Sequence, residues 1–320
     1  MRRREIVAWL IAASVPAGAW AQKQPRISIL HSGFPYRTAI HELIGELGKH
    51  GYENGRTATI DVLGGEGNAE RLAALVAQLA AQKPDVIIAL TSPAAFALKR
   101  AGVTSPVVFA FIVDPVGQGL VQSLARPGGN FTGMTYSEAE LGSKRLGLLL
   151  DAVPEIKRIA FLWGQQFPEN ALLVESMRKS ASDRGLVVFS RKIRDVEDLA
   201  AAFDEATRAE AQGAVFMTDN RLFGIRKRVA ELAIAHHLPS MHSFNLEVED
   251  GGLMFYGPSV SDSYALAAAF ADKIIKGARP GELPVEQPTR FEFGINLRTA
   301  RALGLTLPPS LLVLADDVIE

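Results

Sequence analysis

Most of the side chains able to bind a small ligand stand at the end of a short apolar run of strand length, and Tyr256 lies on a candidate strand between the two halves of the chain. In the first half of the chain these candidates are Ser32, Phe34, Thr91, Ser92, Pro93 and Asp114, and in the second half they are Trp163, Gln165, Asp219, Asn220 and Tyr256. The carboxyl ends of parallel strands share one edge of a sheet, where open α/β proteins bind their ligands. This mixture of hydroxyls, amides, carboxylates and aromatic rings suits a ligand held by hydrogen bonds and stacking better than acid–base catalysis. We therefore predict a binding site built from these residues.

Each of these candidates also has a purely structural interpretation. Thr91 can cap the helix that Pro93 opens, although free N–H groups at such a helix start also bind carboxylates or phosphates. Asp219 can cap the helix that follows it, or it can bind the ammonium group of a ligand. Asp114 precedes a proline, which is a turn signal. Trp163 can lie in the core or form a stacking surface for the ligand.

Motifs that carry out catalysis are missing or incomplete. The sequence contains no GxSxG elbow, no HExxH pair and no phosphate-binding GxxxxGK[ST] loop. Gly65-Glu66-Gly67 follows an apolar run, but Glu70 stands where a dinucleotide fingerprint requires its third glycine. His236 and His237 lie at an expected helix end, where capping is the simpler interpretation. We expect no enzyme, no metal site and no cofactor.

Apolar runs of strand length alternate with amphipathic stretches of helix length, and this alternation predicts doubly wound parallel sheets. The expected strands of the first half are Arg26–Leu30, Thr57–Leu63, Asp85–Leu90 and Pro106–Phe111, with helices at about Arg37–His50, Ala69–Gln82 and from Ser92 onward. The expected elements of the second half are strands at Arg158–Trp163, Gly185–Ser190 and Ala214–Thr218 and helices at Pro168–Arg184, Val196–Ala211 and Leu222–His236. The fold class is therefore α/β, with two lobes.

Several strands are expected to connect the two lobes, and together they would form a hinge. Phe131–Tyr136 and Gly252–Gly257 are the candidate crossover strands, and the helix at Asp262–Lys276 would return to the first lobe. The N-terminal lobe is then expected to contain residues 22–135 and about 258–280. The C-terminal lobe would contain residues 136–257 and about 281–320. Two lobes joined in this way close on a ligand held between them.

The first 21 residues have the features of a cleaved signal peptide. Arg2, Arg3 and Arg4 precede a short apolar run, and Ala19-Trp20-Ala21 supplies the small residues before a cleavage point. A run of about ten apolar residues is too short to span a bilayer as a helix. A buried N-terminal helix and a retained anchor are the alternatives. We expect export to the periplasm by the Sec or the twin-arginine route, with a mature chain that is not inserted in the membrane.

Composition excludes several further classes of function. The 320 residues are 48% hydrophobic and 22% charged, which is typical of a folded protein with about two domains. The formal net charge of -1 offers no basic surface for nucleic acid. The absence of cysteine excludes disulfides, thiol nucleophiles and zinc–thiolate sites.

Many short motifs, in order along the chain, resemble one family of transport proteins. They are Glu46-Leu47-Gly48-Lys49-His50-Gly51-Tyr52, Asp85-Val86-Ile87-Ile88, Asp114-Pro115-Val116, Arg126-Pro127-Gly128-Gly129-Asn130-Phe131-Thr132-Gly133, Glu140-Leu141-Gly142-Ser143-Lys144-Arg145-Leu146, Leu283-Pro284-Val285-Glu286-Gln287-Pro288-Thr289, Phe291-Glu292-Phe293 and Pro308-Pro309-Ser310-Leu311-Leu312. With them, nearly the whole mature chain resembles the ABC transporter substrate-binding proteins related to tryptophan- and tyrosine-binding lipoproteins.

This resemblance implies a type I periplasmic-binding fold and delivery of a small solute to an ABC permease and its ATPase. It implies that hydroxyls and N–H groups at Ser32, Thr91 and Ser92, with an acidic residue at Asp219, hold an amino acid. The chain departs from the family where Trp163-Gly164-Gln165-Gln166 replaces a frequent Asn-Pro pair, which changes one wall of the expected site. We expect a monomer that binds an amino acid, either aromatic or branched. A periplasmic sensor subunit and an exported enzyme on the same fold are the alternatives.

Overall fold

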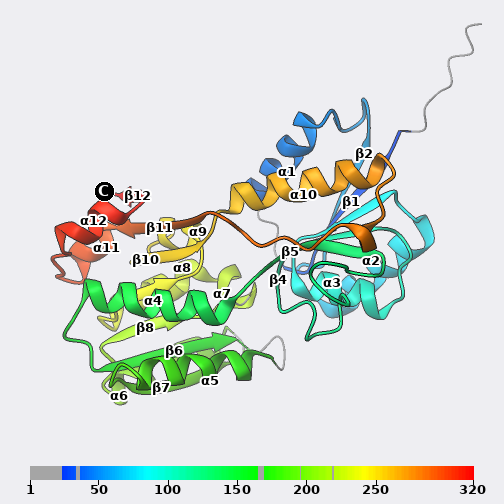
Figure 1. Ribbon diagram of the computed structural model, residues 1–320. Coiled ribbons are helices and arrows are strands. Elements are labelled where there is room, and N and C mark those ends of the chain that lie inside the picture. The colour runs from blue at the N-terminus through cyan, green and yellow to red at the C-terminus, as the bar shows by residue number, and fades with distance from the viewer. Residues whose placement is uncertain (1–23, 34–36, 165–168, 195, 218–219) are drawn as a thin grey trace, which may run out of the picture.

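The computed structural model describes residues 24–33, 37–164, 169–194, 196–217 and 220–320 and divides them between two sheets (Figure 1). Helices cover both faces of each sheet, so each sheet is the centre of one α/β lobe. Three segments of the chain pass between the lobes. The prediction of a two-lobed α/β fold with a multi-strand hinge is confirmed.

The first lobe is built on a parallel sheet with the strand order β2-β1-β3-β4-β5. Its strands are β1 (Arg26–His31), β2 (Thr59–Gly64), β3 (Val86–Ala89), β4 (Val107–Val113) and β5 (Phe131–Tyr136). Its helices are α1 (Arg37–Lys49), α2 (Ala69–Gln82), α3 (Ser92–Arg100) and α10 (Val260–Ile275), followed by a short 3-10 helix at Pro280–Glu282. Helices α1 and α10 bury one face of the sheet, and α2 and α3 bury the other.

The second lobe has a seven-stranded sheet with the order β12-β11-β10-β9-β8-β6-β7. Its strands are β6 (Arg158–Gly164), β7 (Val187–Ile193), β8 (Gly213–Phe216), β9 (Ser240–His242), β10 (Met254–Pro258), β11 (Phe291–Asn296) and β12 (Asp317–Ile319). Its helices are α4 (Glu138–Ala152), α5 (Glu169–Ser182), α6 (Asp198–Arg208), α7 (Asn220–Gly224), α8 (Arg226–Ala235), α9 (Asn245–Glu249), α11 (Leu297–Ala302) and α12 (Pro309–Leu314). All neighbouring strands in this sheet are parallel except β10 and β11.

The three crossings occur where β5 leads into α4, where β10 leads into α10, and before β11 (Figure 1). Residues up to about 286 belong to the first lobe, slightly beyond the expected boundary at 280. Val285 packs in the first-lobe core, and Glu286 forms a parallel bridge with Met134 at the end of β5. This bridge fixes the third crossing beside the first.

Two local expectations need correction. Phe131–Tyr136 was expected to be a strand between the lobes, but it is the last strand of the first sheet, where it pairs with β4 on both sides of a register shift. The expected helix Leu222–His236 is two helices that meet at Ile225. Gly224 ends the first of them, and glycine is a poor helix residue because it loses the most backbone freedom.

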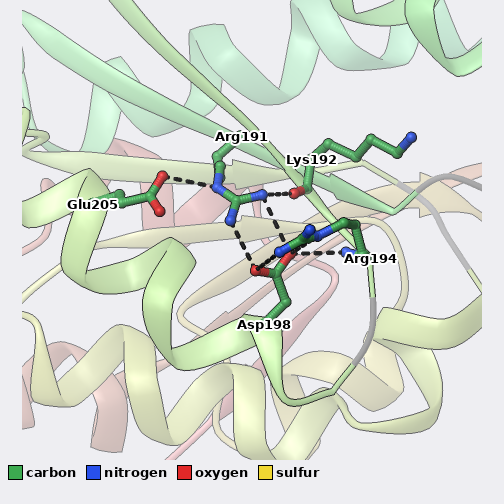
Figure 2. A network of polar contacts seen from close by, with 5 residues as sticks. All are labelled: Arg191, Lys192, Arg194, Asp198 and Glu205. Carbon is green, nitrogen blue, oxygen red and sulfur yellow. Dashed lines mark hydrogen bonds and ion pairs between the residues drawn. The ribbon is translucent and has the colours of Figure 1, made fainter.

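A cluster of charged side chains fastens α6 to the edge strand β7 (Figure 2). Arg191 on β7 donates to the carboxylate of Asp198 over 2.8 Å and to that of Glu205 over 2.8 Å. Arg194 donates to the same Asp198 from its side chain and its backbone, both over 3.1 Å. These hydrogen bonds, above all those from Arg194, hold the pKa of Asp198 well below its usual range despite burial.

We expect Asp198→Asn to lower the free energy of unfolding by about 1–3 kcal/mol, because hydrogen bonds to a charged group contribute about that much. The folded pKa of Asp198 lies below the unfolded value of about 3.9, so this contribution is complete well above pH 4. It is lost as the pH falls below that value. Denaturant unfolding at pH 7 and pH 3 would therefore show a difference between wild type and variant that shrinks in acid.

Asp204→Asn is the matched control, because Asp204 lies on the same helix and its side chain is 65% exposed. An equal loss of stability in the two variants would contradict the role of the Asp198 network.

Candidate functional site

The carboxyl ends of the strands face the opposite lobe in both sheets, except for β11 and β12, which run the other way. In the first sheet β5 runs into a crossing at its carboxyl end, and β1, β3 and β4 are parallel to it. In the second sheet β10 runs into a crossing at its carboxyl end, and β6, β8 and β9 are parallel to it. The predicted candidates that follow these strands therefore lie on two edges that face each other across the crossings.

Ser32 and Thr91 are brought together at the edge of the first sheet. The Thr91 hydroxyl accepts from the backbone N–H of Ser32 over 3.1 Å and lies 3.0 Å from the Ser32 hydroxyl. Thr91 stands at the N-cap position of α3 with extended backbone, yet its side chain makes no capping hydrogen bond to that helix. The hydroxyl thus organises the neighbouring loop, and the start of α3 at Ser92 and Pro93 has no side-chain cap from Thr91. A helix start of this kind can receive an anionic group.

The contacts of Asp114 agree with the interpretation in which this residue forms a turn. It is exposed, has a left-handed backbone with φ of 46°, and accepts the N–H of Gly117 over 2.8 Å. A Cβ atom at Gly117 would lie 2.0 Å from the carboxylate as it is placed, so the Asp114 side chain lies directly over this glycine. The turn that follows β4 depends on this pair of residues.

The candidates of the second lobe are distributed differently. Trp163 is half-buried, packs against the core under α4 and α5, and donates from Nε1 to Ser190 on β7 over 3.2 Å. Asn220 is the first residue of α7. Phe34, Gln165 and Asp219 lie outside the described residues.

Tyr256 occupies the hinge. Its ring stacks on Phe291 with centroids 5.9 Å apart, and these two residues flank the second and third crossings. Its backbone carbonyl accepts from Arg145 Nε over 2.7 Å. Burial raises the pKa of the Tyr256 phenol. These contacts of Tyr256 therefore hold the segments of the second and the third crossing together.

A buried charge cluster lies beneath these crossings, and it consists of Glu138, Arg145 and Glu247. The side chains of Arg145 and Glu138 are 1% and 3% exposed and form an ion pair. Among the described residues, Arg145 Nη2 and Glu138 Oε2 have no hydrogen-bond partner. Burial raises the pKa of Glu138, and the nearby Glu247 also raises it, while Arg145 opposes both effects.

Glu247 fixes the loop that follows β9. Its Oε2 accepts the N–H groups of Ser243 and Phe244, both over 3.0 Å. Burial alone would raise the pKa of Glu247, but His242 and these two N–H groups lower it on balance. A Cβ atom at Gly257 would lie 2.0 Å from the Ser243 carbonyl oxygen, so this loop rests directly on the end of β10.

Three residues at the edge of the second lobe lie outside the predicted set of ligand-binding residues, although the segment from Ser240 to Phe244 was recognised as a strand end. Phe223 and Phe244 are half-buried and in edge-to-face contact, and the guanidinium of Arg226 lies 4.9 Å from the centroid of Phe223. Phe223 falls within an expected amphipathic helix and looked like an ordinary core residue. Phe244 follows an apolar run in the same way as the other candidates, and this position could have identified it.

His31 is a further buried group at the first edge. Its Nδ1 lies 2.9 Å from the Gly33 carbonyl oxygen, and its ring packs against Gly64, where a Cβ atom would lie 2.7 Å from the ring. Burial lowers the pKa of His31, although the Gly33 carbonyl opposes this effect. A neutral ring that supports the loop after β1 is consistent with these contacts.

Within the described part of the chain, no group of three histidine, aspartate or glutamate side chains could hold a metal ion. None of the helices in the same residues is long and apolar enough to cross a membrane.

Two α/β lobes, three crossings and facing strand edges define a type I periplasmic-binding fold. The profile of the family described as ABC transporter substrate binding protein matches residues 35–319. The chain therefore belongs to the ABC transporter substrate binding protein family. Members of this family bind small ligands, and the family is not one of enzymes.

Individual relatives agree with this assignment. A tyrosine-binding protein of Clostridioides difficile (strain R20291) is 25% identical over 256 residues, which is 80% of this chain and 73% of the relative. The ABC domain from Streptococcus pneumoniae in complex with L-Trp is 26% identical, with a TM-score of 0.85 over 92% of this chain and 100% of that one. A conserved domain protein of Vibrio cholerae shares the fold at 23% identity, with a TM-score of 0.86 and the same coverage of both chains.

We expect Arg145→Met to lower the free energy of unfolding by about 3–5 kcal/mol, because it leaves Glu138 buried without its cation. Replacing both residues, as Glu138→Leu with Arg145→Met, removes the unpaired charge and should recover a large part of that loss. Denaturant unfolding of the two variants and the wild type measures both effects. A double variant no more stable than Arg145→Met would show that the pair is not the source of the cost.

Proposed function

We propose that the protein is the exported solute-binding subunit of an ABC import system and that it captures an amino acid between its two lobes. The facing carboxyl edges of the two sheets are the observation that carries this proposal. A ligand that contacts both edges favours the closed arrangement of the lobes by its contacts with both at once. The family membership and the relatives that bind tyrosine and tryptophan support an amino acid as the ligand.

The polar end of the ligand belongs, in this proposal, at the edge of the first lobe. The start of α3 carries partial positive charge, and Thr91 does not cap it, so a carboxylate fits there. The hydroxyls of Ser32 and Thr91 are fixed by their contact and would complete the binding of the α-carboxylate. Asp219, which lies outside the described residues, is the proposed partner of the ammonium group.

The remaining parts of the proposal follow from the sequence. Residues 1–21 would direct the chain to the periplasm and be removed after Ala21. The mature monomer would then deliver its ligand to a cognate permease and its ATPase.

Titration of the mature chain with the twenty amino acids, followed by calorimetry and by thermal melting, tests this function. A ligand that stabilises the protein with a dissociation constant in the micromolar range or below is expected. If no amino acid binds, the ligand belongs to another class of solute.

For the amino acid that binds, we expect Thr91→Val to weaken affinity by about tenfold or more. A hydrogen bond to a charged group contributes about 1.5–3 kcal/mol, and each 1.4 kcal/mol is a factor of ten. Thr91→Ser keeps the hydroxyl and should stay within a few fold of the wild type. Equal affinities for the valine and serine variants would remove the hydroxyl from the site.

A further inference from the structure

Four ionisable side chains are buried together beneath the crossings between the lobes. Glu138 and Arg145 come from α4, His242 comes from β9 and Glu247 comes from α9. Their side chains are between 0% and 10% exposed. Helix α4 packs against β9 and β10, and α9 packs against the same two strands. The four groups therefore share one region of low dielectric, where the charge of each affects the ionisation of the others.

The hydrogen bonds of Ser240 bear on the charge of His242. The Ser240 hydroxyl oxygen accepts the N–H of Leu253 over 3.1 Å and lies 3.0 Å from His242 Nε2. Within the described part of the chain, Nε2 is the acceptor for the hydroxyl proton, so the neutral ring carries its own proton on Nδ1. Nδ1 lies 3.5 Å from Glu247 Oε1, and the ring stacks on Phe216 with centroids 4.9 Å apart. This arrangement suits a neutral ring that directs its N–H toward Glu247.

With a neutral ring, the cluster has one positive and two negative charges. Arg145 pairs with Glu138, whereas Glu247 accepts two backbone N–H groups. Tyr256 on β10 is a further titratable neighbour of Arg145, and burial raises the pKa of its phenol, so it adds no charge near neutral pH. One negative charge is therefore uncompensated in a region that is shielded from water, which is costly. Binding of one proton removes that cost.

Glu138 is the member of the cluster that is best placed to take this proton. Its Oε1 pairs with Arg145, while its Oε2 is buried and has no hydrogen-bond partner in residues that the structure describes. Both oxygens of Glu247 face donors instead. Burial and the charge of Glu247 raise the pKa of Glu138 against the effect of Arg145. The pKa of Glu247 is lowered, against the effect of burial, by His242 and the two N–H groups.

We propose that Glu138 binds one proton in the folded protein and that this buried proton site links closure of the lobes to the pH of the surroundings. Glu138 comes directly after the first crossing, and Arg145 donates to the carbonyl of Tyr256 just before the second. A proton on Glu138 removes the charge that balances Arg145, so the contact between α4 and β10 depends on the protonation state.

The link to ligand binding follows from the position of this site. Closure moves the crossings, which changes the surroundings of Glu138 and hence its affinity for a proton. By reciprocity, the affinity for the ligand then changes with pH. This coupling rests on the proposed function, whereas the proton site itself does not.

The first test measures the proton site without any ligand. Denaturant unfolding of the mature full chain is compared with that of Glu138→Gln and Glu140→Gln between pH 4 and pH 9. Glutamine cannot ionise, so Glu138→Gln represents the protonated form at every pH. Glu140→Gln is the matched control, because Glu140 is an exposed glutamate in the first turn of the same helix.

The folded pKa of Glu138 is raised above the unfolded value, so its contribution to stability is complete at low pH and is lost as the pH rises through the folded pKa. We therefore expect Glu138→Gln to gain stability relative to the wild type as the pH rises. The gain is about tenfold in the unfolding equilibrium constant for each unit by which the pKa is raised. Glu140→Gln should show no such gain. A difference between Glu138→Gln and wild type that is the same at every pH would overturn the proton site.

If Glu138→Gln does not fold, carbon-13 NMR of the glutamate carboxyl groups answers the same question. We expect one carboxyl group of the wild type to titrate above the usual value of about 4.3. In Glu247→Gln the like charge is gone, so this group should titrate at a lower pH than in the wild type. A wild type in which every glutamate titrates at or below the usual value would contradict the proposal.

The second test uses the amino acid that binds in the titration described above. Calorimetry in phosphate and in Tris, two buffers with different ionisation enthalpies, gives the number of protons exchanged on binding. We expect the same number for wild type and Glu140→Gln and a different number for Glu138→Gln. Equal numbers for all three proteins would overturn the coupling and leave the proton site intact. A protein that binds no amino acid would overturn the coupling together with the proposed function, and the first test would still decide the proton site.

Discussion

Arg145 extends from the second turn of α4 to the carbonyl of Tyr256, and its charge is balanced there by Glu138 at the start of the same helix. Glu138 comes directly after the first crossing between the lobes, and Tyr256 comes directly before the second. The Tyr256 ring then stacks on Phe291, where the third crossing ends. The crossing segments are thus joined through one buried arginine, which donates to the carbonyl on β10, and through the aromatic stack that follows.

Burying the Arg145–Glu138 pair costs free energy. Taking two charges out of water costs several kcal/mol per ion, and the attraction between them recovers this only where the remaining polar atoms are satisfied. Here Arg145 Nη2 and Glu138 Oε2 lack partners among the described residues. The arrangement is therefore poorly explained by stability alone. The hydrogen bond from Arg145 to the Tyr256 carbonyl does, however, fix α4 against β10, and the Glu138 carboxylate on the same helix balances the charge of the arginine that makes it.

The same buried charges also support the loop that carries Phe244. Glu247 holds the Ser243 and Phe244 N–H groups and lies close enough to Glu138 to raise the pKa of that residue. Gly257, next to Tyr256, lets the Ser243 carbonyl oxygen approach the end of β10. The hinge and the loop that carries Phe244 are consequently packed against each other. A movement of β10 would therefore displace Phe244.

The sequence predicted much more of the fold than of this arrangement. Alternating apolar runs identify β1, β3 and β6, because buried parallel strands read as continuous apolar segments. The hydroxyl pair of Ser32 and Thr91 could also be predicted from the sequence, since both residues follow such runs. Arg145 was not, because no helix was predicted over residues 138–152, and a single arginine cannot be distinguished from a solvated one until its partner Glu138 is known to be buried. The role of Tyr256 in the hinge could not be predicted either, because it depends on Phe291, which is 35 residues away along the chain.

The described residues of the two edges differ in chemistry. The first edge offers hydroxyls and an uncapped helix start, which can satisfy a charged group but give little apolar contact area. The second offers aromatic rings on a rigid loop, which give contact area but cannot satisfy a carboxylate. Under the proposed function, a ligand that contacts both edges gains from each of them, and its contacts with both lobes at once shift the lobes toward closure. A solute that reaches one edge alone makes the same contacts in the open and the closed arrangement, so it would leave the balance between the two unchanged.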